Sequence, residues 1–207
     1  MKNSKAYESF INQINSAGSQ KLDGYNENLF NEIYDSEIEQ VEDLVWSTFY
    51  NKHDTDILVL FPKLQKYDGI KALKQIIGNY SIPSQVNMLI SYLLYQNTRE
   101  SEYLGLIEKN IVESHYNYSY IALLNNLKPS EQVYQLLVRV YESCSNRIAL
   151  STCINGILFN KGFINDIDDL EQLSGIKELR KILKIAPLNE RKAMIEKMEN
   201  GEFNQYK

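Results

Sequence analysis

The chain has 207 residues, of which 43% are hydrophobic and 24% are charged, a composition typical of one or at most two globular domains. No run approaches the roughly 18 apolar residues of a membrane span, and no apolar segment near the start indicates a secretory signal. Two cysteines, Cys144 and Cys153, are too few for a disulfide framework, so we expect a cytoplasmic protein without membrane association.

The net charge of −5 is concentrated near the amino terminus. Residues 1–45 hold nine acidic and three basic side chains, a charge of −6, and the remaining residues sum to +1. A general nucleic-acid binder usually has the opposite sign, so nucleic acid is an unlikely partner. The excess of Lys over Arg and the many Asn, Ile and Tyr residues are typical of AT-rich genomes and indicate a low-GC bacterium.

Residues 1–35 are expected to form an irregular, partly helical cap. Apolar spacing over residues 7–14 predicts a short amphipathic helix, and the segment 16–20 would end it. Ser36 with Glu39 three residues later matches a capping box, which predicts a helix over about 37–50.

Two apolar patterns then alternate between Ile57 and Ile157. One places apolar residues at a first position, three and four residues on, and seven residues on; the other spaces them by three and then four. The first pattern occurs at Ile57/Leu60/Phe61/Leu64, Val86/Leu89/Ile90/Leu93, Tyr120/Leu123/Leu124/Leu127 and Leu150/Cys153/Ile154/Ile157. The second occurs at Ile70/Leu73/Ile77, Leu104/Ile107/Ile111 and Val133/Leu136/Val140.

Both patterns are typical of a helix that buries one face. Successive copies of one pattern lie 29 to 34 residues apart, and a repeated helix pair at such a period indicates an α-solenoid. We therefore predict an all-α fold, with about four antiparallel helix pairs in a right-handed superhelix over residues 36–185. No sustained period of two predicts a strand.

Two prolines affect these helices. Pro62 lies inside a helix predicted from about residue 54 to 67, where proline either kinks a helix or makes it end and restart. Pro187 separates the repeats from a C-terminal helix and tail, residues 186–207, whose last six residues are expected to be disordered.

Short helix pairs with a proline-bent first helix resemble HEAT and armadillo repeats. The resemblance covers roughly residues 38–185 and depends on spacing alone, since the period of about 30 is shorter than the ~40 residues of a HEAT repeat. Tetratricopeptide and ankyrin signatures are missing. The resemblance implies a scaffold that binds a partner along its surface.

No motif indicates catalysis, a cofactor or a metal. His53 and His115 are far apart in predicted loops and lack metal-ligand spacing. Neither a Gly-x-Ser-x-Gly elbow nor a Gly-rich phosphate loop is present. Asp166, Asp168 and Asp169 stand at a predicted helix start, where carboxylates favour the dipole, and this interpretation is preferred to a metal site.

Two features indicate a protein partner, each with a structural alternative. The acids Glu37, Glu39, Glu42 and Asp43 would attract a basic protein, or would form an ordinary solvated helix face. Tyr116 and Tyr118 would be interface anchors, or would pack between repeats. The face next to the Leu104/Ile107/Ile111 and Val133/Leu136/Val140 stripes is mixed and mildly acidic, which argues against nucleic acid, and its residues Arg139 and Glu142 are further candidate contacts for a protein partner.

These features favour a non-catalytic, intracellular protein-binding scaffold. The most specific hypothesis is a bacterial immunity protein that neutralises a cognate toxin, such as a basic nuclease, through the acids and the tyrosine corner. The alternatives are a HEAT-like enzyme that acts on nucleic acid, such as a DNA-repair enzyme, and an assembly adaptor.

Overall fold

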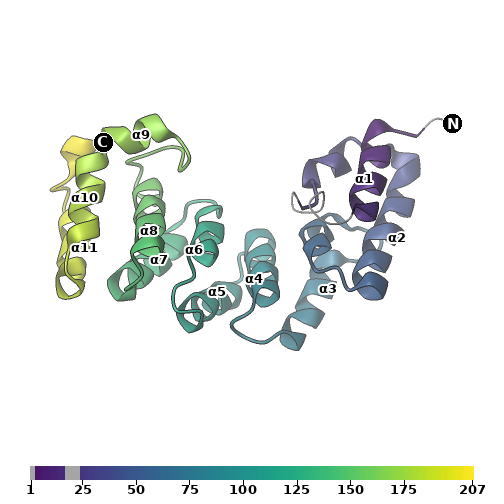
Figure 1. Cartoon of the computed structure of the whole chain (residues 1–207), viewed down its shortest axis with the longest axis horizontal. Helices are drawn as coiled ribbons and strands as arrows, with labels where there is room; N and C mark the ends of the chain where they lie inside the picture. The colour runs from purple at the N-terminus through teal and green to yellow at the C-terminus, as the bar shows by residue number, and fades with distance from the viewer. Residues whose placement is uncertain (1–2, 17–23) are drawn as a thin grey trace. The chain divides into compact units, whose positions relative to one another are not determined.

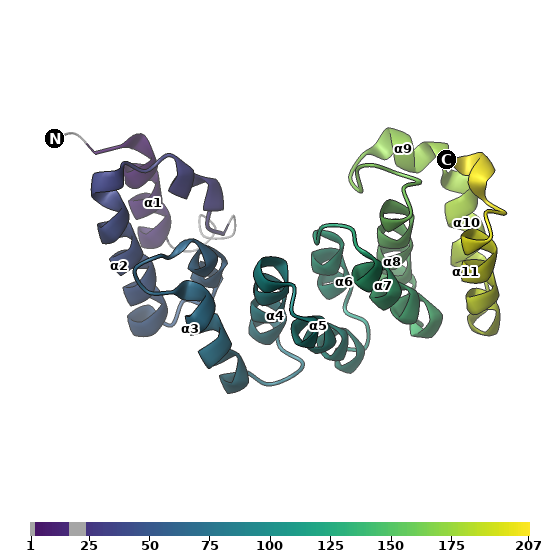
Figure 2. The same ribbon diagram turned by 180° about the vertical axis from the view of Figure 1, so that it is seen from behind.

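In the computed structural model, which describes residues 3–16 and 24–207, every regular element is helical and no strand occurs (Figures 1 and 2). The predicted all-α class is confirmed. Contacts divide the chain into unit 1, Met1–Ser81 with Gln85–Arg99, and unit 2, Ile82–Ser84 with Glu100–Lys207. The sequence predicts a different division, into segments 1–35, 36–185 and 186–207, which these contacts do not test and which stays a prediction. Most of the expected break at 16–20 lies outside the described residues.

Unit 1 packs its helices around the central 3-10 helix η3. Phe10, Val41, Val45 and Leu60 are fully buried in its core, as the apolar spacing requires. Its elements are α1 (Lys5–Asn15), η2 (Glu27–Asn31), α2 (Asp35–Lys52), η3 (Asp56–Lys63), α3 (Gly69–Ile76), η4 (Ile77–Asn79) and α4 (Gln85–Thr98).

The α-helix predicted through Pro62 is wrong. Residues 56–63 form the 3-10 helix η3 instead, and the chain turns before α3 begins at Gly69. Proline has no N–H to donate, and its ring clashes with the carbonyl four residues earlier, so an α-helix is disfavoured through Pro62. Leu64 closes η3 by donating its N–H to the carbonyl of Phe61 at 3.0 Å.

Gly69 lies directly against this segment. A Cβ atom at Gly69 would stand 1.8 Å from the carbonyl oxygen of Phe61, whereas one at Gly78 would meet nothing within 4 Å. Only glycine therefore allows the start of α3 to approach η3 this closely.

Replacing Gly69 with Ala should lower the free energy of unfolding by about 3 kcal/mol, because backbone must move to accept the methyl group. The matched change Gly78→Ala should leave stability unchanged or raise it by up to about 1 kcal/mol. Urea denaturation of both variants measures the difference, and equal stabilities would contradict the close approach.

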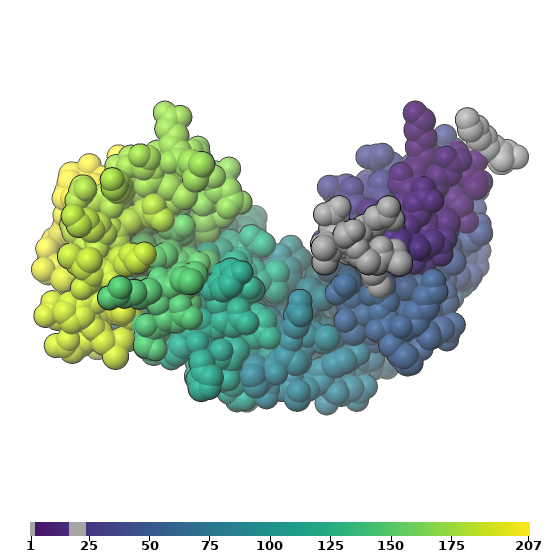
Figure 3. Space-filling view, viewed as in Figure 1, coloured from purple at the N-terminus to yellow at the C-terminus, as the bar shows by residue number. Residues whose placement is uncertain are grey.

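Unit 2 consists of short helices joined by tight connections. Within it α5 contacts α6 and α7, α8 contacts α6, α7 and α10, and α11 contacts α7. The elements are α5 (Ser101–Glu113), α6 (Tyr118–Asn125), α7 (Glu131–Ser143), α8 (Arg147–Asn160), α9 (Leu170–Gly175), α10 (Lys177–Ile185), η5 (Leu188–Glu190), α11 (Arg191–Glu199) and η6 (Asn204–Tyr206). The space-filling view shows that side chains close the gaps between the ribbons within each unit (Figure 3).

The same asparagine contact occurs twice in unit 2. The side chain of Asn110 accepts the N–H of Ser84 at 3.2 Å and donates one turn back to a helix carbonyl. Asn160 does the same with the N–H of Ser130, at 3.1 Å. Both serines follow a proline, so each asparagine holds the backbone of an earlier connection of the same unit.

The C-terminal segment is held by a buried arginine. Nη1 of Arg191 donates to the carbonyl oxygens of Tyr141 and Cys144, at 2.7 and 2.6 Å, where α7 ends. The hydroxyl of Tyr141 in turn donates to the carbonyl of Leu183 at 2.8 Å. The expected disorder of the last six residues is wrong, because Phe203 is buried and η6 follows it.

Replacing Arg191 with Met should destabilise the protein by about 3 kcal/mol, because the carbonyls at the end of α7 lose charge-assisted hydrogen bonds. The neighbouring exposed change Lys192→Met should alter the free energy of unfolding by less than about 0.5 kcal/mol. Chemical denaturation distinguishes the two variants, and similar values would show that the guanidinium does not hold α11.

Candidate functional site

Glu37, expected to contact a partner, is instead buried at the junction of α1 and α2. Its carboxylate accepts the N–H and hydroxyl of Ser4, at 2.9 and 2.6 Å, and the N–H of Tyr34 at 3.2 Å. The helix thus starts at Asp35, with Glu37 in the capping position that the sequence assigned to Glu39. Burial acts to raise the pKa of Glu37, but the hydrogen bonds hold it below its ordinary value of 4.5.

Glu42 is also structural. Its side chain is only 2% exposed, and it accepts the backbone N–H groups of Gln65 and Lys66 at 3.1 and 2.7 Å. These donors lie in the turn between η3 and α3, which has no helical partners for them. The expectation that Glu42 shares a solvated face with Glu39 and Asp43 is therefore wrong.

Glu39 and Asp43 do face solvent, but both form an ion pair with the same lysine of this chain, Lys66. Nζ of Lys66 lies 2.8 Å from a carboxylate oxygen of each, and Asp43 also accepts the hydroxyl of Tyr67. The hydrogen bond from Lys66 is the main cause that lowers the pKa of Asp43. The acidic patch on unit 1 is thus reduced to two carboxylates that Lys66 partly neutralises.

The remaining predicted residues belong to unit 2. Tyr118, the first residue of α6, is 54% exposed, and Tyr116 is half-buried in a left-handed backbone conformation. Tyr120, expected in the core, is half-buried as well. Glu142 is half-buried near the end of α7. Tyr118 thus presents the most accessible aromatic ring of this connection.

Arg139 lines a groove between α5 and α7. Its Nε and Nη2 donate to the two carboxylate oxygens of Glu108, at 2.8 and 2.9 Å, in a bidentate pair. The hydrogen bond that Arg139 donates to Glu108 raises the pKa of Arg139 above its ordinary value. The groove has a volume of about 330 Å³ and is lined by Ser101, Leu104, Gly105, Glu108, Glu131, Gln132, Gln135 and Arg139.

Gly105 leaves this groove open. Glycine inside a helix costs about 1 kcal/mol relative to Ala, and here a Cβ atom would meet nothing within 4 Å. Packing within the described residues therefore does not require glycine at this position. Gly105 was not predicted as a functional residue, although an isolated glycine within the Leu104/Ile107/Ile111 pattern is a sequence feature that indicates a special position.

A second groove lies within unit 1, where α2 ends. It has a volume of about 420 Å³ and brings aromatic rings together around an exposed histidine. Its lining residues are Phe49, Tyr50, His53, Thr55, Ile76, Asn79 and Tyr80. It holds no carboxylate or lysine, so it offers fewer directional contacts than the groove between α5 and α7.

Other sequence candidates have structural roles. Asp169 caps α9 by accepting the N–H groups of Glu171 and Gln172, which lower its pKa. His115 is exposed in the left-handed conformation at the end of α5, and Cys144 and Cys153 are buried and free. Among residues 3–16 and 24–207 no cluster of His, Cys, Asp and Glu is placed to hold a metal ion. None of the described helices is both long and apolar enough to cross a membrane.

The carboxylate of Glu37 should make stability depend on pH. Because its pKa is lowered on folding, its contribution is fully present above about pH 5 and is lost as the pH falls through the folded pKa. The variant Glu37→Gln should therefore lose less stability than the parent between about pH 5 and pH 3, and Ser4→Ala should show an intermediate slope. Urea denaturation at several pH values gives the slopes, and identical slopes would contradict the capping role.

Comparison with protein-family models, with curated proteins and with solved structures finds no match for this chain. The resemblance to HEAT and armadillo repeats is therefore a prediction from spacing, and function has to be argued from the surface itself.

Proposed function

We propose that the protein is a non-catalytic binding protein whose groove between α5 and α7 holds a segment of another polypeptide. The observation that carries this proposal is the open space over Gly105. A helix that keeps an interior glycine without a packing requirement lets another chain approach its backbone closely. Leu104 adds an apolar contact at the same place.

The walls of the groove suit a polypeptide. Amide side chains such as Gln135 can hydrogen-bond a peptide backbone, and Gln135 already donates to Glu131 at 2.7 Å. The pair Glu108–Arg139 supplies one charge of each sign at the groove. Such a mixed lining gives orientation and specificity, while the apolar floor supplies affinity.

The architecture that we propose for this function is a HEAT-like α-solenoid. Contacts between helices support it, because Glu108 of α5 bonds Arg139 of α7, 31 residues on. Likewise the amide of Asn125 of α6 donates to the carbonyl of Thr152 of α8, 27 residues on, at 2.9 Å. These offsets are close to the sequence period, as expected when successive helix hairpins stack in parallel.

Neutralisation of a toxin stays the most specific form of this proposal. In unit 1, a basic toxin would contact Glu39 and Asp43, and it would have to compete with Lys66 for both carboxylates. Glu37 and Glu42 are removed from that contact by their burial. The assembly adaptor and the nucleic-acid enzyme also stay hypotheses.

Peptides selected from a displayed random library against the full chain provide the test. Gly105→Phe should weaken their binding by at least about tenfold, because the ring fills the floor of the groove. Gly105→Ala should weaken binding less, while raising the free energy of unfolding by up to about 1 kcal/mol. Fluorescence anisotropy and urea denaturation measure the two effects.

Lys109→Phe is the matched control, since Lys109 is exposed on α5 but does not line the groove. It should leave the Kd of the selected peptides unchanged. Selection of no peptide, or equal binding by the parent and Gly105→Phe, would remove this groove as the binding site.

A further inference from the structure

Four cations follow one face of α10. Lys177, Arg180, Lys181 and Lys184 occupy positions i, i+3, i+4 and i+7, so their side chains share an arc of about 100° around the helix. The opposite face buries Leu179 and Leu183. This face of α10 is therefore positively charged, although the whole chain has a net charge of −5.

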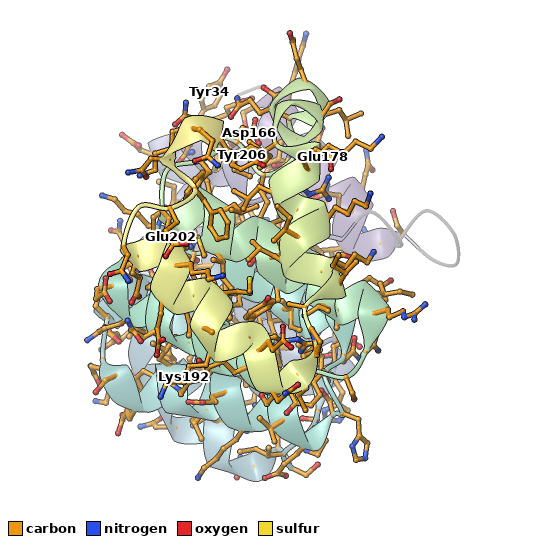
Figure 4. The ribbon with its side chains drawn as sticks, turned by 90° about the vertical axis from the view of Figure 1, so that its left-hand side faces the viewer. Tyr34, Asp166, Glu178, Lys192, Glu202 and Tyr206 are labelled. Carbon is orange, nitrogen blue, oxygen red and sulfur yellow. The ribbon has the colours of Figure 1, made fainter. Side chains whose placement is uncertain are left out.

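Among the described residues, no carboxylate forms an ion pair with this cationic face. The neighbouring helix α8 contains neither Asp nor Glu, and the only acid of α10, Glu178, lies at the edge of the face, three residues before Lys181. Glu178 and the two terminal helices are seen in Figure 4. Within the described part of the chain, none of the four cations forms an ion pair. Nε of Arg180 donates to Asn155 at 3.0 Å, which orients the guanidinium beside α8.

The arrangement disfavours the isolated helix. Lys177 stands at the first residue of α10, where the helix dipole repels a cation. Lys177 with Lys181, and Arg180 with Lys184, place like charges four residues apart, which also destabilises a helix. Glu178 in the first turn and Lys184 in the last turn offset part of this repulsion, and an external anionic group would stabilise the helix further.

The cations border a groove that is also apolar. The α8/α10 groove has a volume of about 320 Å³ and includes Ile154 and Ile185 among its lining residues. Ile185 is 70% exposed, and Leu188, three residues beyond it, is 55% exposed. A row of positive charge thus runs beside accessible aliphatic side chains. The complete lining is Ser151, Ile154, Lys177, Arg180, Lys181, Lys184 and Ile185.

We infer that the α8/α10 groove binds an acidic segment of a partner protein, one that carries apolar side chains between its carboxylates. Charge complementarity requires an anionic partner. The exposed Ile185, which lines the groove, favours a polypeptide over a phosphate backbone, because a phosphodiester chain has no aliphatic group to cover it. This surface is separate from the groove between α5 and α7 and does not depend on the function proposed for it.

The test uses the full chain and a fluorescein-labelled peptide of about 16 residues with Leu and Glu at helical spacing. The triple variant Lys177→Gln/Lys181→Gln/Lys184→Gln should weaken binding by at least about tenfold, because glutamine keeps the helix but removes the charge. Ile185→Ser should weaken binding of this peptide but not of a matched peptide in which Ser replaces Leu. Circular dichroism of each variant checks that it is folded.

The control variant Lys109→Gln/Lys192→Gln/Lys197→Gln removes the same total charge from α5 and α11, and Figure 4 labels Lys192, the second residue of α11. It should bind the Leu/Glu peptide like the parent. Equal losses in the two triple variants would overturn the proposal, because general electrostatics would then explain binding. Tighter binding to duplex DNA or to vesicles of phosphatidylglycerol than to the peptide would also overturn it and assign the face to phosphate.

Discussion

The arrangement of unit 2 depends on the guanidinium of Arg191. A buried cation is costly unless it is hydrogen-bonded, and here it meets the carbonyl oxygens at the end of α7, where the helix dipole is negative. Tyr141 then ties the same end of α7 to Leu183 in α10. Together these bonds fix the position of α10 along α7 and α8. The face that α10 presents to solvent, and therefore its cationic row, follows from this position.

Unit 1 uses buried carboxylates for the same purpose. Glu37 and Glu42 both accept backbone N–H groups that have no helical partner, one at the start of α2 and the other in the turn before α3. Two of the four clustered acids in this part of the sequence therefore act as hydrogen-bond acceptors for the backbone. The two that reach solvent, Glu39 and Asp43, are the ones with a cation between them.

The apolar spacing was sufficient to predict most helices, because each buries one stripe whatever it packs against. Val133, Leu136 and Val140 of the predicted stripe, for example, are all buried in α7. Three errors had identifiable physical causes. Pro62 favoured a 3-10 helix, the capping acid of α2 was Glu37 rather than Glu39, and burial of Glu42 depended on a turn distant in the sequence. The cationic row of α10 was not predicted, because the net charge of residues 46–207 does not show where charges of one sign gather. Its helical spacing is nevertheless visible in the sequence.

Both proposed binding surfaces use the hairpin of α7 and α8. The first helix of this hairpin contributes Gln135 and Arg139 to one groove, and the second contributes Ser151 and Ile154 to the other. The hairpin is closely packed, since Cys153 of α8 lies with its sulfur 3.1 Å from the carbonyl of Leu137 in α7. A rigid hairpin with a groove on each helix lets two segments bind without competing for the same residues. Two such segments on one partner would bind with an affinity greater than either alone, which suits a protein whose single grooves are small.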